Sequence, residues 1–381
     1  MPLIYLLAGE HSGDVLGARL MAALRTRAAG VRFAGIGGPR MTAEGLHSLF
    51  PMQDLALMGL LEVLPRLRRL HRRLSETVAD IAARRPDVVV TIDSPDFALR
   101  LLKAIAPLGL PRVHYVAPQA WAWRERRVRH FRGRWERLLC LLPFEPEFFA
   151  GHGLPARFVG HPVLESGADR GDAARFCAAH SLPPEARVLV LMPGSRGTEV
   201  AHLLPIYGRT LELLARRIPA LVPVVPVAAA VAATVRRAAA RWPMPPLIVT
   251  EAADKHDAFA AAAAALTKSG TATLELALAG VPMAVTYRVN ALTAAIARRL
   301  IRVPHVAMVN LLAGEALVPE LLQEACTPER LADTLEMLLA SAEAGAAQRR
   351  GFKSVLASLR PPEGLPSAAA AAAVLELLHQ P

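Results

Sequence analysis

Cysteine, aromatic residues and long apolar runs are all scarce in this chain of 381 residues. Cys140, Cys177 and Cys326 are too few and too widely separated to indicate a disulfide framework or a zinc site, and they fit a reducing cytoplasm. The longest apolar stretches, at 222–235 and 258–266, are interrupted by proline or too short to cross a bilayer. We therefore expect any contact with a membrane to be peripheral.

The sequence also lacks the segments that indicate export or metal-dependent nucleotide binding. Its first residues form an apolar run that enters a glycine turn, without the basic region and cleavage site of a signal peptide, so we expect no exported form. It contains no Asp-x-Asp triplet and no histidine, cysteine and carboxylate cluster with metal-ligand spacing. We therefore expect neither a metal nor another cofactor.

Basic residues outnumber acidic ones, with 44 Lys and Arg against 33 Asp and Glu and a formal net charge of +11. This charge indicates an anionic partner, and nucleic acid, acidic lipid headgroups and phosphorylated substrates all meet that description. A content of 53% hydrophobic and 20% charged residues is typical of folded domains. The length favours two domains of about 150 to 200 residues with a cleft between them.

Apolar runs alternate with helical periods along the chain, which predicts an α/β fold of two doubly wound, Rossmann-like domains. The runs lack period-2 polarity and are typical of buried parallel strands. We expect an N-terminal domain at 1–165, a C-terminal domain at 166–355, and a last segment at 356–381 whose helix packs back on the first domain. The six alanines at 368–373 are interpreted as helix formers only.

Ligands of doubly wound sheets bind beyond the carboxyl ends of the strands, so the loops after the apolar runs are candidate sites. Glycine-rich loops follow the first two runs, at 8–14 and 35–41. The first carries Glu10 and suits ligand binding at a helix start, but it is equally compatible with a tight turn in which Ser12 or Asp14 caps the next helix.

Asp93 and Asp96 follow the apolar run DVVVTI, so two carboxylates are expected at the carboxyl end of a strand. This position suits a general base. We favour Asp93 as the base and Asp96 as a helix cap, because a helical period begins directly after Asp96.

Two loops of the second half, PGSRGTE and TKSGTATLE, combine glycine with residues that suit a nucleotide. The candidate residues are Ser195, Arg196, Ser269, Gly270, Thr271 and Glu275. The Arg196 guanidinium can bind a diphosphate through two hydrogen bonds, and the amides at a helix start favour phosphate oxygens. Glu275, one turn later, suits ribose hydroxyls. A capping box at Thr271 imitates the second pattern and stays open as an alternative.

Two arginine-rich segments also need an interpretation. The segment 117–135 contains Trp121, Trp123 and Trp135 and is similar to a nucleic-acid surface, although anionic lipid or diphosphate binding explains the same composition. The segment 61–74 has apolar residues at helical spacing and arginines on the other face, which predicts either an interfacial helix or a helix packed on its own core. The membrane candidates are Val63, Leu64, Arg66, Leu67, Arg69 and Leu70.

Taken together, the motifs resemble, in order, the motif set of the lipid-A-disaccharide synthase family from residue 8 to about 324. They are AGEHSGD, GIGGPRM, MGLLEVLP, IDSPDF, HYVAPQAWAWR, LLPFEPEFF, FVGHPV, PGSRGTEV, KSGTATLELAL, PMAVTYRVNALT and NLLAGEALVPELLQE. The resemblance implies a GT-B fold, in which two Rossmann-like domains face a central cleft. It implies inverting transfer of 2,3-diacylglucosamine from UDP-2,3-diacylglucosamine to 2,3-diacylglucosamine 1-phosphate, giving β-1,6-linked lipid A disaccharide 1-phosphate and UDP.

By position, the resemblance assigns the acceptor to the loops that contain Glu10, Asp93 and Asp96, and UDP to the two loops of the second half. It adds four residues to the cleft, namely Arg288, Asn290, Asn310 and Glu315. It also implies anionic lipids of the inner membrane as partners on the cytoplasmic side and no nucleic acid, and it is compatible with a homodimer. His11 departs from the small residue or proline expected there, so the acceptor contacts at this position stay open.

Two alternatives remain after the sequence analysis. Another GT-B enzyme, such as a UDP-N-acetylglucosamine 2-epimerase or a peptidoglycan-precursor transferase, would use comparable phosphate loops. A non-enzymatic nucleic-acid-binding protein would use the segment 117–135 and bind oligonucleotides with a steep dependence on salt. The paired loops of the second half argue against the latter.

Overall fold

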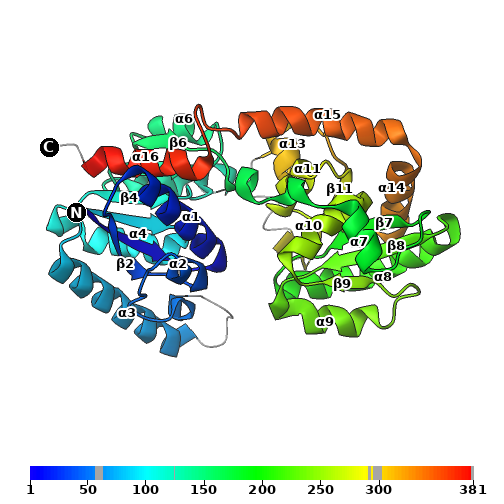
Figure 1. The fold of residues 1–381 in the computed structure, drawn as a ribbon, viewed down its shortest axis with the longest axis horizontal. Coiled ribbons are helices and arrows are strands. Elements are labelled where there is room, and N and C mark those ends of the chain that lie inside the picture. Colours follow the sequence, from blue (N-terminus) through cyan, green and yellow to red (C-terminus); the bar gives the residue numbers. More distant parts are fainter. Residues whose placement is uncertain (56–62, 124, 291–292, 295–302, 379–381) are drawn as a thin grey trace. The chain divides into compact units, whose positions relative to one another are not determined.

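The computed structural model divides into two compact units, each described by itself (Figure 1). The described residues are 1–55, 63–123, 125–290, 293–294 and 303–378. The first unit comprises Met1–Pro162 together with Leu359–Pro381, and the second comprises Val163–Ser358. None of the helices in the described ranges has both the length and the hydropathy that crossing a membrane requires.

The first unit is built on a six-stranded parallel sheet in the order β2-β1-β3-β4-β5-β6. The strands are β1 Leu3–Ala8, β2 Arg32–Ile36, β3 Val88–Ile92, β4 Arg112–Tyr115, β5 Arg137–Cys140 and β6 Ala156–Phe158. All residues of β3 are buried, as expected of a central parallel strand covered by helices on both faces. The strand predicted from the apolar run DVVVTI is confirmed as β3.

Helices cover both faces of this sheet. They are α1 His11–Arg27, α2 Pro39–Ala43, α3 Val63–Arg84, α4 Pro95–Ala104, α5 Ala120–Trp123, α6 Glu145–Ala150 and α16 Pro366–Leu378, with 3₁₀ turns at Met52–Leu55, Ala106–Leu108 and Glu125–Phe131. The long α3 carries most of the arginine-rich segment 61–74. Helix α4 begins directly after Asp93 and Ser94.

The chain returns to the first unit through α16, which packs against α1. Its alanines do more than form a helix, because Ala370, Ala371 and Ala373 are fully buried in the core of this unit. Small side chains allow close approach of the two helices. At the carboxyl end, Glu376 accepts hydrogen bonds from Arg137 at 2.7 Å and from Arg157 at 2.6 Å.

The second unit repeats the architecture, with a six-stranded parallel sheet in the order β12-β11-β10-β7-β8-β9. Its strands are β7 Arg187–Met192, β8 Leu221–Pro226, β9 Leu247–Val249, β10 Ala262–Lys268, β11 Met283–Tyr287 and β12 Glu320–Leu322. Its helices are α7 Ala173–Ala179, α8 Gly197–Arg217, α9 Ala229–Ala239, α10 Ala252–Ala261, α11 Ala272–Leu278, α13 Met308–Ala313, α14 Pro328–Ala340 and α15 Ala342–Ser358, with 3₁₀ turns at Pro162–Glu165, Ala168–Arg170 and Gln323–Ala325. The edge strand β12 is not among the strands predicted from the sequence.

Candidate active site

The first glycine loop and the loop after β3 meet at the carboxyl end of the first sheet. Gly9 approaches Ser94 so closely that a Cβ atom on Gly9 would overlap the Ser94 hydroxyl. Ser12 Oγ donates a hydrogen bond of 3.2 Å to Asp93 Oδ2. The neighbouring strands β1 and β3 thus bring two candidate loops together, as the topology of a doubly wound sheet predicts.

Asp93 and Ser94 adopt a left-handed backbone conformation that non-glycine residues seldom adopt. Their φ angles are 54° and 46°. Such a conformation costs about 1 to 3 kcal/mol per residue and concentrates at functional sites. The Asp93 amide donates a hydrogen bond of 2.9 Å to the carbonyl of Tyr115, which holds this turn. We interpret the strained turn as a means of directing the half-buried Asp93 carboxylate.

The structure corrects the capping role predicted for Asp96. Helix α4 begins at Pro95 with Ser94 in the N-cap position, and the Ser94 side chain forms no capping hydrogen bond. Asp96 lies in the first turn, where its negative charge suits the positive end of the helix dipole. Its carboxylate is 71% exposed and lies 3.9 Å from Arg127 Nη2.

The structure also gives Asp14 a different role from that of a cap for the first helix. Glu10 occupies the N-cap position of α1, and its exposed side chain forms no capping hydrogen bond. Asp14 is fully buried and accepts backbone hydrogen bonds from Gly38 at 2.8 Å, Arg40 at 3.0 Å and Met41 at 3.0 Å. Asp14 therefore accepts hydrogen bonds from the backbone amides at the start of α2. The second glycine loop has a structural explanation, because a Cβ atom on Gly38 would lie 2.6 Å from Asp14 Oδ2.

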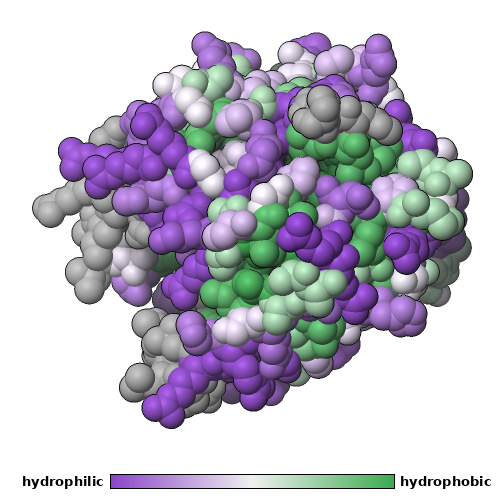
Figure 2. Space-filling model, turned by 90° about the vertical axis from the view of Figure 1, so that its left-hand side faces the viewer, coloured by the Kyte–Doolittle hydropathy of each residue, from purple (hydrophilic) through white to green (hydrophobic). Residues whose placement is uncertain are grey.

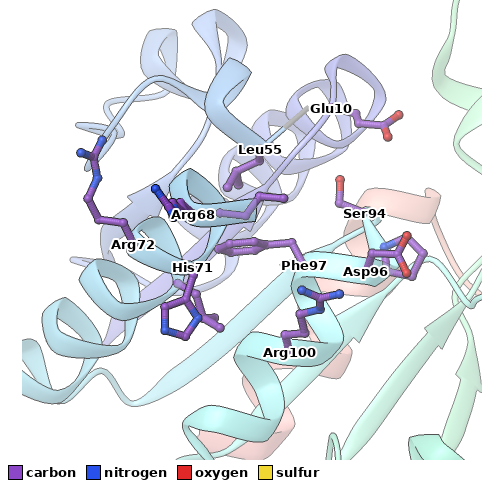
Figure 3. A pocket seen from close by; sticks show the side chains of 12 residues that line it. Glu10, Leu55, Arg68, His71, Arg72, Ser94, Asp96, Phe97 and Arg100 are labelled. Carbon is purple, nitrogen blue, oxygen red and sulfur yellow. The ribbon is translucent and has the colours of Figure 1, made fainter. Parts of the chain in front are cut away.

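A cavity of about 750 Å³ adjoins these loops within the first unit. Its lining includes Leu55, Leu70, Leu74, Pro95 and Phe97, together with Glu10, Arg68, His71, Arg72, Ser94, Asp96 and Arg100. Figure 3 shows Ser94 and Asp96 on one side, with the ring of Phe97 between Ser94 and the side chains of α3. The cavity thus combines an apolar wall with cations and carboxylates, an arrangement suited to an amphiphilic anion.

At Leu70, helix α3 fits the second of its two predicted interpretations, a helix packed on its own core, rather than an interfacial helix. Leu70 is 9% exposed and belongs to the core of the first unit, so its burial does not support direct contact with a membrane. Arg69 is exposed and lies 3.5 Å from Asp54. The side chains of Val63, Leu64, Arg66 and Leu67 lie outside the described residues.

The tryptophans of the segment 117–135 are engaged in packing where they are described. Trp135 is buried and stacks on His114 with ring centroids 5.5 Å apart. Trp121 Nε1 donates a hydrogen bond of 3.1 Å to the buried Glu145 carboxylate, whose pKa burial raises to about 7. The Trp123 side chain lies outside the described residues. Neither described indole is an exposed stacking platform, which disfavours the nucleic-acid hypothesis.

In the second unit, the loop after β7 directs a cation outward. Gly194 has a φ of 109°, and Arg196 occupies the N-cap position of α8. The Arg196 side chain is 75% exposed and lies 3.4 Å from Glu199, while Ser195 is exposed beside it. Arg196 is therefore available to an anionic ligand.

The loop after β10 lies at the same edge of the sheet, because β7 and β10 are neighbours. Ser269 Oγ donates a hydrogen bond of 2.8 Å to the carbonyl of Val306, which fixes this buried serine. Gly270 has a φ of 153°, and, apart from its chain neighbours, no heavy atom of the described residues lies within 4 Å of the position that a Cβ atom would take. Thr271 precedes α11 and forms no side-chain capping hydrogen bond, so the capping box is not observed.

Four other predicted residues make contacts within the second unit. Glu275 accepts hydrogen bonds of 3.1 Å from Lys255 at both carboxylate oxygens. Arg288 donates to the Cys326 carbonyl at 3.3 Å, and Asn290 accepts from the Thr293 amide at 2.8 Å.

The fourth of these residues, Asn310, is fully buried. Its Nδ2 donates hydrogen bonds to the carbonyl of Val318 and to the carboxylate of Glu320, and its Oδ1 accepts one from the amide of Val318. We interpret it as a residue that positions the loop before β12, whereas the predicted Glu315 is exposed.

Sequence reasoning missed three residues beside Arg196. Lys268 Nζ lies 3.0 Å from Glu199 and 5.4 Å from the ring centroid of Tyr287. Burial and the Glu199 carboxylate raise the pKa of Tyr287, while Arg196 lowers it. The signal was present in part, since Glu199 and Lys268 belong to the two loops already singled out.

Comparisons with known proteins show the family to which the chain belongs. A family model described as lipid-A-disaccharide synthetase matches residues 4–374. The chain is 63% identical over 390 residues to the lipid-A-disaccharide synthase of Granulibacter bethesdensis, with 100% of this chain and 99% of that protein covered.

Solved structures share the fold at low sequence identity. UDP-GlcNAc 2-epimerase from Neisseria meningitidis, bound to UDP-GlcNAc, has a TM-score of 0.67 at 12% identity, with 100% of each chain covered. A calicheamicin glycosyltransferase has a TM-score of 0.60 at 17% identity, with 99% of this chain and 98% of that chain covered. The predicted GT-B fold is confirmed, and the chain belongs to the lipid-A-disaccharide synthase family of glycosyltransferases.

Proposed function

We propose that this protein transfers 2,3-diacylglucosamine from UDP-2,3-diacylglucosamine to 2,3-diacylglucosamine 1-phosphate, with inversion to a β-1,6 linkage and release of UDP. The observation that carries the proposal is the strained Asp93 turn beside a cavity with apolar and cationic walls. The turn supplies a base, and the cavity suits an acylated sugar phosphate. The donor belongs to the loops of the second unit.

Asp93 is the general base in this proposal. Its carboxylate accepts the proton of the acceptor 6-hydroxyl while that oxygen attacks the anomeric carbon of the donor. The bond between the anomeric carbon and the phosphate oxygen breaks, and its electron pair stays on the leaving UDP. Ser12 orients the carboxylate through its hydrogen bond to Oδ2. Glu10 and Asp96, which both line the cavity, contact the acceptor sugar.

The donor diphosphate binds to Arg196 and to the loop 269–271 in this proposal. The support is the exposed guanidinium of Arg196 and the space at Gly270 that the described residues leave unfilled. A guanidinium and backbone amides stabilise negative charge as it develops on the leaving group. Ser195, Glu275, Arg288, Asn290 and Glu315 complete the donor site, and Asn310 acts by positioning its loop.

The acceptor binds in the cavity of the first unit, with its acyl chains against Leu55, Leu74 and Phe97 and its phosphate near Arg68 or Arg100. The exposed arginines of α3 bring this unit to the anionic surface of the inner membrane, where such lipids reside. Figure 2 shows apolar side chains gathered among hydrophilic ones on one face of the molecule. That distribution suits a peripheral contact.

The direct test is incubation of the purified protein with both lipid substrates, with mass spectrometry of the lipid product and measurement of released UDP. Formation of the tetra-acylated disaccharide phosphate, dependent on both substrates, is the expected result. UDP release without the acceptor, or conversion of UDP-N-acetylglucosamine to its epimer, would contradict the proposal.

A further inference from the structure

A single carboxylate oxygen lies between two cations at the edge of the second sheet where the diphosphate is proposed to bind. Glu199 Oε1 lies 3.0 Å from Lys268 Nζ and 3.4 Å from Arg196 Nη1. Lys268 is the last residue of β10, and Glu199 lies in the first turn of α8. The carboxylate therefore occupies the point at which both cations converge.

The surroundings of Glu199, Lys268 and Arg196 suit an anion larger than the Glu199 carboxylate. Gly194 carries no side chain, and a Cβ atom there would lie 2.8 Å from Glu199 Oε2. Within the described part of the chain, no heavy atom other than those of the neighbouring residues lies within 4 Å of a Cβ atom placed on Gly270. Lys268 Nζ lies 5.4 Å from the centroid of the Tyr287 ring. This cation–π interaction stabilises the ammonium independently of Glu199.

We propose that Lys268 is a second cation of the diphosphate site and that Glu199 is its counterion in the ligand-free protein, displaced when a nucleoside diphosphate binds. This inference rests on the proposed function, because UDP is the leaving group of that reaction. A diphosphate carries more negative charge than the single guanidinium of Arg196 neutralises. As the bond to the sugar breaks, the electron pair stays on the β-phosphate oxygen, and Lys268 stabilises that charge.

The proposal is tested by calorimetric binding of UDP, UMP and uridine to the full chain. Lys268→Met should weaken UDP binding by about ten- to a hundredfold and leave uridine binding unchanged, since a charge-assisted contact to phosphate is lost. Lys268→Arg should recover most of the UDP affinity. Glu199→Gln should tighten UDP binding several-fold, because the competing carboxylate is gone.

Arg217→Met is the matched control. It removes a 2.6 Å ion pair with Asp333 at the carboxyl end of α8, whereas Glu199 lies in the first turn of this helix. It should leave the affinities for UDP and uridine unchanged. Melting temperatures of all variants, compared with the wild type, separate a binding defect from loss of folding.

The outcomes separate this inference from the function it rests on. Wild-type UDP affinity in a folded Lys268→Met variant would overturn the role of Lys268, even in a protein that forms the disaccharide. Equal or weaker UDP binding by Glu199→Gln would overturn the role of Glu199 as a displaced counterion. A wild-type protein that binds UDP without forming the disaccharide would contradict the proposed function alone.

Discussion

The hydroxyl of Ser12 donates a hydrogen bond of 3.2 Å to the carboxylate of Asp93, although 81 positions separate the two residues in the chain. Ser12 lies in the first turn of α1, and Asp93 follows β3, so the contact joins two loops that leave neighbouring strands. In the proposed reaction it fixes one carboxylate oxygen and leaves the other to accept a proton.

Ser12→Ala should therefore lower kcat by about tenfold, because the hydrogen bond to a charged group is lost while the base itself remains. Steady-state assays at saturating substrates measure this effect. Ser12→Thr is the control and should keep most of the activity, because it retains the hydroxyl. Full activity of a folded Ser12→Ala variant would show that the contact does not orient Asp93.

Arg196→Ala should weaken the use of the UDP-sugar, because the variant loses a charge-assisted contact to the diphosphate worth roughly 1.5 to 3 kcal/mol. We expect the donor KM to rise about ten- to a hundredfold, with a smaller change in the acceptor KM. The Arg196 side chain is 75% exposed, so the melting temperature should hardly change. A donor KM and kcat equal to those of the wild type would exclude this role.

The proposed membrane role of α3 can be separated from its packing role. Leu70→Ser should lower the free energy of unfolding by about 2 to 5 kcal/mol, because Leu70 is buried in the core. Joint replacement of the exposed Arg69 and Arg72 by glutamine should instead weaken binding to anionic vesicles, by about 1 kcal/mol of binding free energy per charge. Sedimentation of the protein with the vesicles measures this binding. Neutral vesicles are the control. Undiminished binding of the double variant to anionic vesicles would contradict docking through these arginines.

Glu145 should make stability depend on pH. Burial raises its pKa to about 7 in the folded protein, from an ordinary value of 4.5. Between these values the folded state retains a proton that the unfolded state has released, so this group's contribution to stability falls as pH rises from about 4.5 to 7. The difference amounts to roughly 3 kcal/mol. Denaturant unfolding at several pH values measures the free energy of unfolding, which should decrease less with rising pH in Glu145→Gln than in the wild type. An identical dependence on pH in both proteins would contradict the shifted pKa.

The strands and the site loops could be predicted because they depend on local patterns. Apolar runs such as that of β3 are typical of buried strands, and polar residues at their carboxyl ends face a ligand in any doubly wound sheet. Asp93 and Arg196 became candidates in this way, and their roles stay predictions. The order of many short motifs then pointed to the family, which the family model confirms.

Contacts between distant segments could not be predicted. Asp14 has the sequence position of a helix cap, but it binds backbone amides of the following α2 start, because the Gly38 backbone passes beside it. The burial of Leu70 likewise depends on what packs against α3. Glu199 and Lys268 meet only because β7 and β10 are neighbours in the sheet.

If Asp93 removes the proton of the acceptor hydroxyl, Asp93→Asn must lower kcat at saturating lipid substrates. The amide keeps the shape of the side chain but cannot act as the base, so we expect kcat to fall by about a hundred- to ten-thousandfold, with UDP affinity and melting temperature unchanged. Asp96→Asn, in the exposed first turn of α4, is the comparison and should cost much less activity. Turnover near that of the wild type for Asp93→Asn would contradict the account and direct attention to Glu10.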